Sequence, residues 1–198
     1  IKGLAPPVKI AANLPYNIST ELLIKWLRAN HLCRVHQAKR DAPNAGQDGA
    51  SRLRLDAPYE RGESAPLWSH MTLMFQKEVA DRILAAPGSK TYGRLSVIAQ
   101  AASRPQRAFD LPARAFTPPP KVSSSVVVFE PAPRLPNIAA LERVTQAAFS
   151  QRRKMLRSSL RAAFGDRLEQ ILAEQGIPET ARAEEISVAR FVALASAA

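Results

Sequence analysis

The sequence has little of what a secreted, metal-dependent or membrane-spanning protein needs. Cys33 is the only cysteine among the 198 residues, so no disulfide can form within the chain. The three histidines, His31, His36 and His70, have no metal-ligand spacing with Cys33 or with carboxylates, so we expect no metal site. No apolar run approaches the roughly 20 residues of a membrane helix, and the first residues do not resemble a signal peptide. We therefore expect a cytoplasmic protein with no membrane attachment.

Acidic residues are also scarce. The chain has 17 Asp and Glu against 28 Lys and Arg, a formal net charge of +11. Such an excess favours a polyanionic partner, with nucleic acid the first candidate and an anionic membrane surface the second. A generally basic soluble enzyme would carry the same charge. The hydrophobic fraction of 46% is ordinary for a globular protein and excludes wholesale disorder.

The first part of the chain predicts an α/β fold. Residues 8–12 form a strand-like run that ends at Asn13, and Ser19 or Thr20 can cap a helix directly after it. Apolar residues on one face of that helix are Leu22, Leu23, Trp26 and Leu27. Strand, tight loop and helix together make the unit from which parallel sheets are built.

Further elements are expected on both sides of a long insertion. Residues 34–66 are polar, interrupted by proline and glycine, and predict a mobile surface loop. Beyond the loop we expect strands at 71–75, 108–111 and 122–129, and helices at 78–85 and 95–102.

After Glu130 the composition changes. Three prolines make a linker, and no strand pattern follows. We expect a helix from Asn137 to Phe149, one over 153–164, one capped by Asp166 and one capped by Ser187. The sequence therefore predicts an α/β part over residues 1–130 and a small all-helical domain over 131–198.

The sharpest motif is Asn13-Leu14-Pro15-Tyr16, at the carboxyl end of the first strand, where open α/β sheets place their ligand sites. The amine of adenine is a poor nucleophile because its lone pair is delocalised into the ring. The Asn13 side-chain oxygen and a main-chain carbonyl of Leu14 or Pro15 can accept its N–H bonds and favour the developing cation. Pro15 stiffens the loop, and Tyr16 offers a ring for an unstacked base. An Asn-x-Pro turn beside a core tyrosine would have the same letters.

Two further segments suit a nucleic-acid substrate. Phe116 precedes the rigid run Thr117-Pro118-Pro119-Pro120-Lys121 and can cover the second face of a flipped base, although a core phenylalanine beside a turn is an equal alternative. Between Gln146 and Arg161 there is no acidic residue. The basic residues of this stretch are Arg152, Arg153, Lys154, Arg157 and Arg161. The four-residue spacing of Arg153, Arg157 and Arg161 predicts a basic helical stripe for RNA phosphates, or else a solvated charged face.

Together these segments resemble the ribosomal RNA small-subunit adenine dimethyltransferase family. Five stretches match in family order: NLPYNIST (13–20), LMFQKEVADRI (73–83), YGRLSV (92–97), FTPPPKVSSSVV (116–127) and AFSQRRKMLRSSL (148–160). The resemblance implies the C-terminal part of a Rossmann-like S-adenosylmethionine methyltransferase domain, followed by a helical RNA-binding domain.

The implied activity is dimethylation of N6 of two adjacent adenines in a hairpin near the 3′ end of small-subunit rRNA. By the same resemblance Asn13 lies beside the methyl donor and the target amine, while Tyr16 and Phe116 hold the base. Lys121 and the basic segment face rRNA, and the stretch Gln76-Lys77-Glu78 is structural or RNA-facing. The implied partner is an immature small ribosomal subunit, bound by a monomer.

The chain departs from the family pattern at its start. No glycine-rich loop, ribose-binding acid or adenine-binding aspartate precedes the strand that ends at Asn13, and Gly3, Gly46 and Gly49 do not replace that loop. We therefore expect a fragment that binds S-adenosylmethionine weakly. Two other functions stay open: a non-enzymatic RNA-binding or ribosome-assembly module, and a DNA adenine-N6 methyltransferase.

Overall fold

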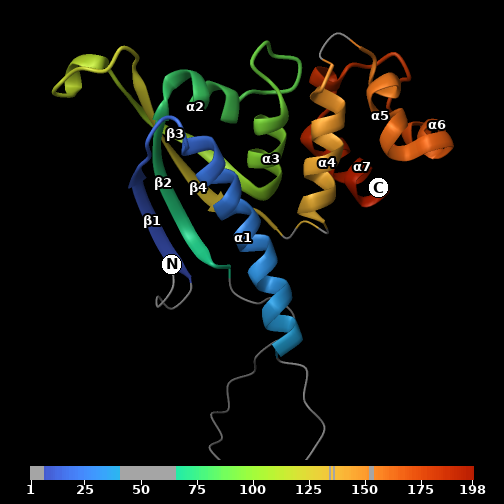
Figure 1. Cartoon of the computed structure of the whole chain (residues 1–198), viewed down its shortest axis with the longest axis horizontal. Coiled ribbons are helices and arrows are strands. Elements are labelled where there is room, and N and C mark those ends of the chain that lie inside the picture. The colour runs from blue at the N-terminus through green and yellow to red at the C-terminus, as the bar shows by residue number, and fades with distance from the viewer. Residues whose placement is uncertain (1–6, 41–65, 134, 136, 152–153) are drawn as a thin grey trace, which may run out of the picture.

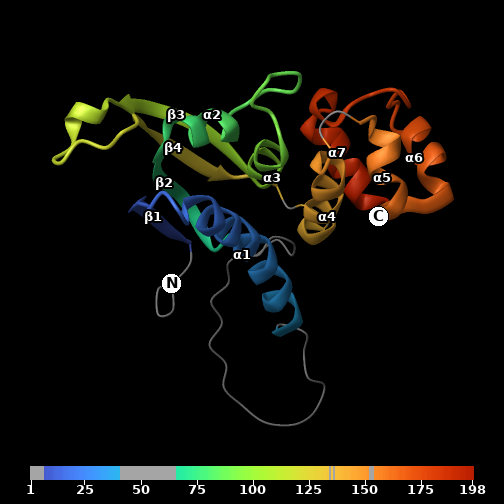
Figure 2. The ribbon, with the colours of Figure 1, turned by 45° about the horizontal axis from the view of Figure 1, so that its top comes forward.

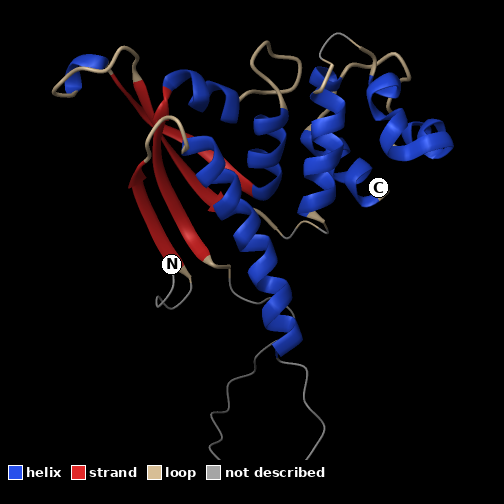
Figure 3. Ribbon diagram, viewed as in Figure 1, coloured by secondary structure: helices blue, strands red, loops and turns tan. Residues whose placement is uncertain are grey.

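A computed structural model describes residues 7–40, 66–133, 135, 137–151 and 154–198, without the side chains of 32–40. A sheet lies at one end of the molecule and a group of helices at the other (Figures 1 and 3). The strands are β1 (Val8–Asn13), β2 (Trp68–Gln76), β3 (Ser103–Leu111) and β4 (Ser124–Pro131), in the spatial order β1-β2-β4-β3. β1 is parallel to β2, whereas β4 is antiparallel to both of its neighbours.

Three helices cover the sheet with apolar side chains. They are α1 (Ser19–Arg40), α2 (Lys77–Ile83) and α3 (Arg94–Ala102). Leu23 and Leu27 of α1 are fully buried in one cluster with Leu73 and Phe75 of β2 and with Phe129 of β4. Each such side chain contributes about 1.5–3 kcal/mol by leaving water, so this cluster fixes α1 against the sheet.

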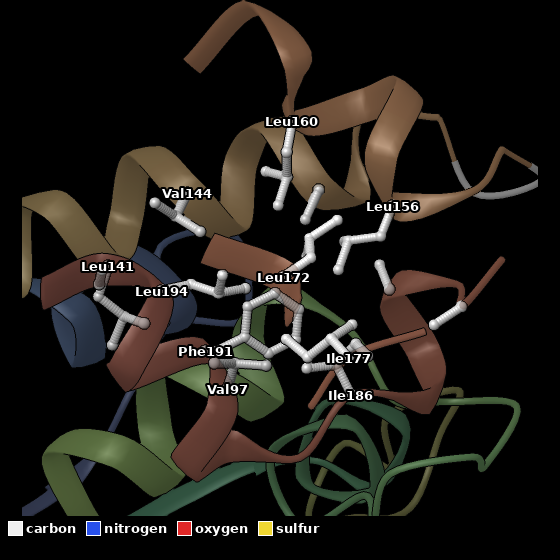
Figure 4. Close-up of a cluster of buried hydrophobic side chains, with 14 of the residues drawn as sticks. Val97, Leu141, Val144, Leu156, Leu160, Leu172, Ile177, Ile186, Phe191 and Leu194 are labelled. Carbon is white, nitrogen blue, oxygen red and sulfur yellow. The ribbon is translucent and has the colours of Figure 1, made fainter. Parts of the chain in front are cut away.

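The C-terminal helices form a second core around α3. They are α4 (Ile138–Phe149), α5 (Leu156–Phe164), α6 (Leu168–Glu174) and α7 (Val188–Ser196). Val97 of α3 packs among their leucines and Phe191 (Figure 4). Tyr92, just before α3, donates its hydroxyl to the carbonyl of Ile186 at 2.9 Å, and burial raises its pKa to about 12. The α/β part and the helices therefore share side chains rather than meeting only through the linker.

An ion pair between an exposed arginine and a buried glutamate adds a second connection. Arg28 of α1 donates to both carboxylate oxygens of Glu142 on α4, one of them through Nε at 3.1 Å. Glu142 is only 8% exposed, so removal of Arg28 would leave a carboxylate on α4 without this partner at a site nearly closed to water.

Most of the expected elements are confirmed, including the helix caps at Asn137 and Ser187, whereas α1 already begins at Ser19, which was expected with Thr20 as a capping residue. The Asn137 side chain accepts the Ala140 amide at 2.9 Å, and Ser187 accepts the Arg190 amide at 3.4 Å. β3 begins at Ser103 instead of 108. It contains Pro105, which is tolerated because β3 pairs only with β4 and lies at the sheet edge.

Three expectations are wrong in detail. The predicted loop 34–66 is helical up to Arg40, since no proline or glycine interrupts α1 before Pro43; residues 41–65 lie outside the described chain. α5 begins at Leu156, not at 153, because Met155 is held extended by a bridge to Arg182. Asp166 lies within the 3-10 turn Gly165–Arg167, and Arg167 takes the N-cap position of α6.

The hairpin between β3 and β4 projects from the sheet (Figures 1 and 2) and is tied back to α2 by charges. Asp110 near the end of β3 pairs with Lys77 at the start of α2, and accepts the Ser125 hydroxyl at 2.6 Å. Arg107 pairs with Asp110 at 3.1 Å and also with Asp81 of α2, so it links the two carboxylates. The hydrogen bond from Lys77, aided by that from Ser125, lowers the pKa of Asp110 from 3.8 to about 2.

This depressed pKa predicts an acid-dependent stability. Because the folded carboxyl has the lower pKa, its contribution is complete above the unfolded value and is lost as the pH falls from about 4 toward 2. Asp110→Asn should therefore lower the urea midpoint of unfolding at neutral pH. The midpoint of this variant should also fall less steeply than that of the unaltered chain as the pH is lowered from about 4 toward 2. Asp166→Asn, which removes an exposed carboxylate with no ion pair in the described chain, is the matched control. Identical acid profiles for Asp110→Asn and the unaltered chain would contradict the network.

Candidate active site

One cavity unites the two motifs that the sequence singles out. It has a volume of about 440 Å³ and lies where β1 ends, beside β2 and the loop that leads into β4. Its lining comes from the first motif, from β2 and from the proline loop: Asn13, Leu14, Pro15, Tyr16, Met74, Phe116, Thr117, Pro118 and Pro120. Segments about 100 residues apart in the sequence therefore face one space. The cavity is the natural candidate for a ligand site.

The first motif is fixed between the core and the start of α1. The Leu14 side chain is buried, whereas Asn13 is exposed at the end of β1. The Pro15 carbonyl accepts the Ile18 amide at 3.1 Å, and the Ser19 hydroxyl donates to the Tyr16 carbonyl at 3.2 Å. Since the Pro15 carbonyl is already engaged, the Leu14 carbonyl is the better second acceptor beside the Asn13 oxygen.

Tyr16 is held through its backbone carbonyl, as described above, and through its side-chain hydroxyl. The ring is half-buried, and its hydroxyl forms a hydrogen bond of 2.8 Å with the hydroxyl of Ser124, the first residue of β4. Sequence reasoning missed Ser124. The available signal was the polar run at 123–125 leading into an apolar strand, because buried hydroxyls require a partner.

Phe116 borders the same cavity from the proline loop. It follows the 3-10 turn Ala113–Ala115 and is half-buried, so part of its ring stays accessible. The following Thr117–Pro118 bond is cis. Tyr16 and Phe116 thus lie on different loops at one cavity, an arrangement that can receive a planar base between or beside aromatic rings.

The predicted basic residues are only partly in one helix. Arg157 and Arg161 are exposed on α5, and Arg157 pairs with Glu179 at 3.1 Å. Lys154 is exposed and precedes α5. Arg152 and Arg153 lie outside the described residues. Lys121 is exposed on the proline loop beside the cavity.

The structure also groups cations that the sequence reasoning did not connect. A depression of about 880 Å³ lies between the segment before α3 and the end of α4. Arg82, Lys90 and Arg94 line it, together with Gln146 and Ser150. Their spacing in sequence gave no periodic signal, because they come from α2, a loop and α3.

The described residues fit a methyl donor only at its reactive end. Asn13 can face a transferred methyl group, but the loop between β1 and α1 has no glycine with which to cradle a nucleotide. The described part of the chain contains no group of three or more potential metal ligands. It also contains no helix that is long and apolar enough to cross a membrane.

Two solved structures resemble this fold. A dimethyladenosine transferase from Plasmodium falciparum superposes with a TM-score of 0.66 at 21% identity, covering 98% of this chain and 68% of that one. The 23S rRNA methyltransferase ErmE superposes with a TM-score of 0.56 at 18% identity, covering 98% and 67%. At these identities the likeness concerns the fold.

Sequence relatives are much closer. A ribosomal RNA small subunit methyltransferase A from Ruegeria sp. (strain TM1040) is 47% identical over 195 residues, which are 97% of this chain and 58% of the relative. The protein of that name from Phenylobacterium zucineum is 46% identical, over 96% of this chain and 55% of the relative. The chain thus spans less than two thirds of these relatives. The model of the family described as ribosomal RNA adenine dimethylase matches residues 4–198, and the chain belongs to that family.

Proposed function

We propose that this chain supplies the target-base pocket and the RNA-binding helices of an rRNA adenine-N6,N6-dimethyltransferase. The substrate would be two adjacent adenines in a hairpin near the 3′ end of small-subunit rRNA, presented by an immature subunit to a monomeric, cytoplasmic enzyme. The observation that carries this proposal is the single cavity lined by Asn13, Leu14 and the two aromatic residues Tyr16 and Phe116.

The chemistry follows from the acceptors at the cavity. An adenine amine that donates one N–H to the Asn13 oxygen and one to the Leu14 carbonyl loses conjugation with the ring, so its lone pair becomes available for attack. As the nitrogen becomes cationic, both fixed acceptors gain interaction energy, which lowers the barrier. The extra proton then leaves to water, and no strong base is required. S-adenosylmethionine, when bound, supplies the electrophilic methyl group.

The aromatic residues have a different task. An adenine must leave its stack to reach the cavity, and this costs a few kcal/mol. Stacking on Tyr16 and Phe116 offsets that cost, at roughly 1–3 kcal/mol for each base-aromatic contact.

Cations on the same molecule support RNA as the substrate. Lys121 lies beside the cavity, whereas Arg82, Lys90 and Arg94 surround the larger depression. Arg157 and Arg161 extend the basic surface along α5. Phosphates along a folded RNA can be neutralised at several of these points while one base enters the cavity.

A non-catalytic RNA-binding or assembly module is the second candidate. It is favoured by the described residues' lack of a nucleotide cradle, while the base cavity favours the enzyme. DNA adenine methylation would use the same Asn13 chemistry. Methylation assays on RNA and on DNA would distinguish an rRNA methyltransferase from a DNA methyltransferase.

Asn13→Ala should abolish most catalysis while the fold persists, because Asn13 is exposed and its side chain is not part of the core. In a protein that joins this chain to the donor-binding half of the family, we expect the methylation rate to fall about 100- to 1,000-fold. Transfer of labelled methyl groups to immature small subunits measures this rate. Asn17→Ala, an exposed asparagine of the same loop, is the control. Methylation of duplex DNA but not of subunits would contradict the rRNA assignment.

If the arginines of α5 contact RNA phosphates, their removal should change how RNA affinity depends on salt concentration. Arg161→Ala should reduce the slope of log affinity against log salt by about 0.7–0.9, the value for one lost phosphate contact. Arg157→Ala should have a smaller effect because Glu179 already compensates that charge. Binding of a small-subunit rRNA hairpin, measured at several salt concentrations, gives both slopes. Arg190→Ala removes the same charge from α7; if all three variants share one slope, α5 has no specific contact with RNA.

A further inference from the structure

The hydrogen bond between Tyr16 and Ser124 joins the two halves of the cavity. The phenol oxygen and the serine oxygen are 2.8 Å apart, across 108 residues of sequence. Ser124 is fully buried, whereas the Tyr16 ring is half-buried and lines the cavity. The hydroxyl of a buried serine is thus hydrogen-bonded to the phenol oxygen of an accessible aromatic side chain.

The strand order shows which parts of the sheet this hydrogen bond connects. Tyr16 follows β1, Ser124 opens β4, and β2 lies between these two strands. Ser124 pairs with Gln76 of β2 and with Leu111 of β3, so its backbone is held on both sides. The Tyr16 side chain therefore reaches past the end of β2 to an oxygen that the central sheet holds in place.

This attachment restricts the ring. A tyrosine fixed only at its Cα can change its side-chain torsions, whereas a hydrogen bond at the phenol oxygen selects one orientation before any ligand arrives. Preorganisation of this kind lowers the entropic cost of binding. We propose that Ser124 is a positioning residue that holds the Tyr16 ring in the orientation that stacks on the target base. The proposal rests on the base pocket proposed above.

Neighbouring serines do not share this role. The Ser125 hydroxyl donates to Asp110 and belongs to the charge network of the hairpin. Ser123 is half-exposed and contributes its backbone carbonyl to the Lys77 amide at 2.9 Å. Ser123→Ala is therefore a matched control that removes one hydroxyl from the same segment.

The test is a double-mutant cycle on binding. A short single-stranded RNA carries one 8-vinyladenine, a fluorescent base that keeps the 6-amino group, and its fluorescence change on titration with the chain gives the dissociation constant. Ser124→Ala and Tyr16→Phe should each weaken binding about three- to tenfold, the value of one neutral hydrogen bond. The double variant should bind no more weakly than either single variant, because both lose the same contact. Ser124→Thr, which keeps the hydroxyl, should restore binding, and Ser123→Ala should leave it unchanged.

The possible outcomes separate the two proposals. Additive losses in the cycle, or unchanged binding by Ser124→Ala, would overturn the positioning role while leaving the base pocket intact. A lower melting temperature with unchanged affinity would show that Ser124 acts only on stability, which also overturns the role. No fluorescence change with the unaltered chain would contradict the base pocket itself and the positioning role with it.

Discussion

The pairing of β2 with both β1 and β4 is the constraint on which the site depends. β1 runs parallel to β2, so Asn13 ends its strand opposite Met74. β4 runs antiparallel to β2, so its first residue, Ser124, pairs with Gln76 at the same edge. The loop leaving β1 and the loop entering β4 must therefore meet, and the cavity is the space that they enclose. A change of register in either pair would separate the acceptors from Phe116.

Packing around α3 connects the helical part to the sheet. Val97 and Tyr92 contribute to the same core as Phe191, while Arg28 and Glu142 connect α1 to α4. The cations of the large depression and the cavity at the end of β1 therefore belong to elements that are packed together. An RNA that contacts both would be aligned by the protein's own core, which is how remote binding energy assists a reaction at one base.

Local sequence signals predicted the acceptor motif, the aromatic loop and most elements, because these depend on nearby residues. Asn13 ends a clear strand, and Asn137 and Ser187 are recognisable caps. Features set by tertiary contacts were missed or placed wrongly. α5 starts at Leu156 because Met155 pairs with Arg182, and Pro105 enters β3 because that strand lies at the edge. Ser124 became visible as a site residue only when the fold placed its hydroxyl on Tyr16.

A pocket formed by the two loops requires that one adenine-sized ligand contacts both of them at once. Backbone amide NMR spectra of the chain, recorded during titration with adenosine, test this most directly. The amide signals of Asn13, Leu14 and Tyr16 should shift together with those of Phe116 and Lys121, with one dissociation constant. Guanosine, whose carbonyl cannot donate to the Asn13 oxygen, should shift them far less. Shifts confined to one loop, or equal responses to both nucleosides, would contradict a shared adenine pocket.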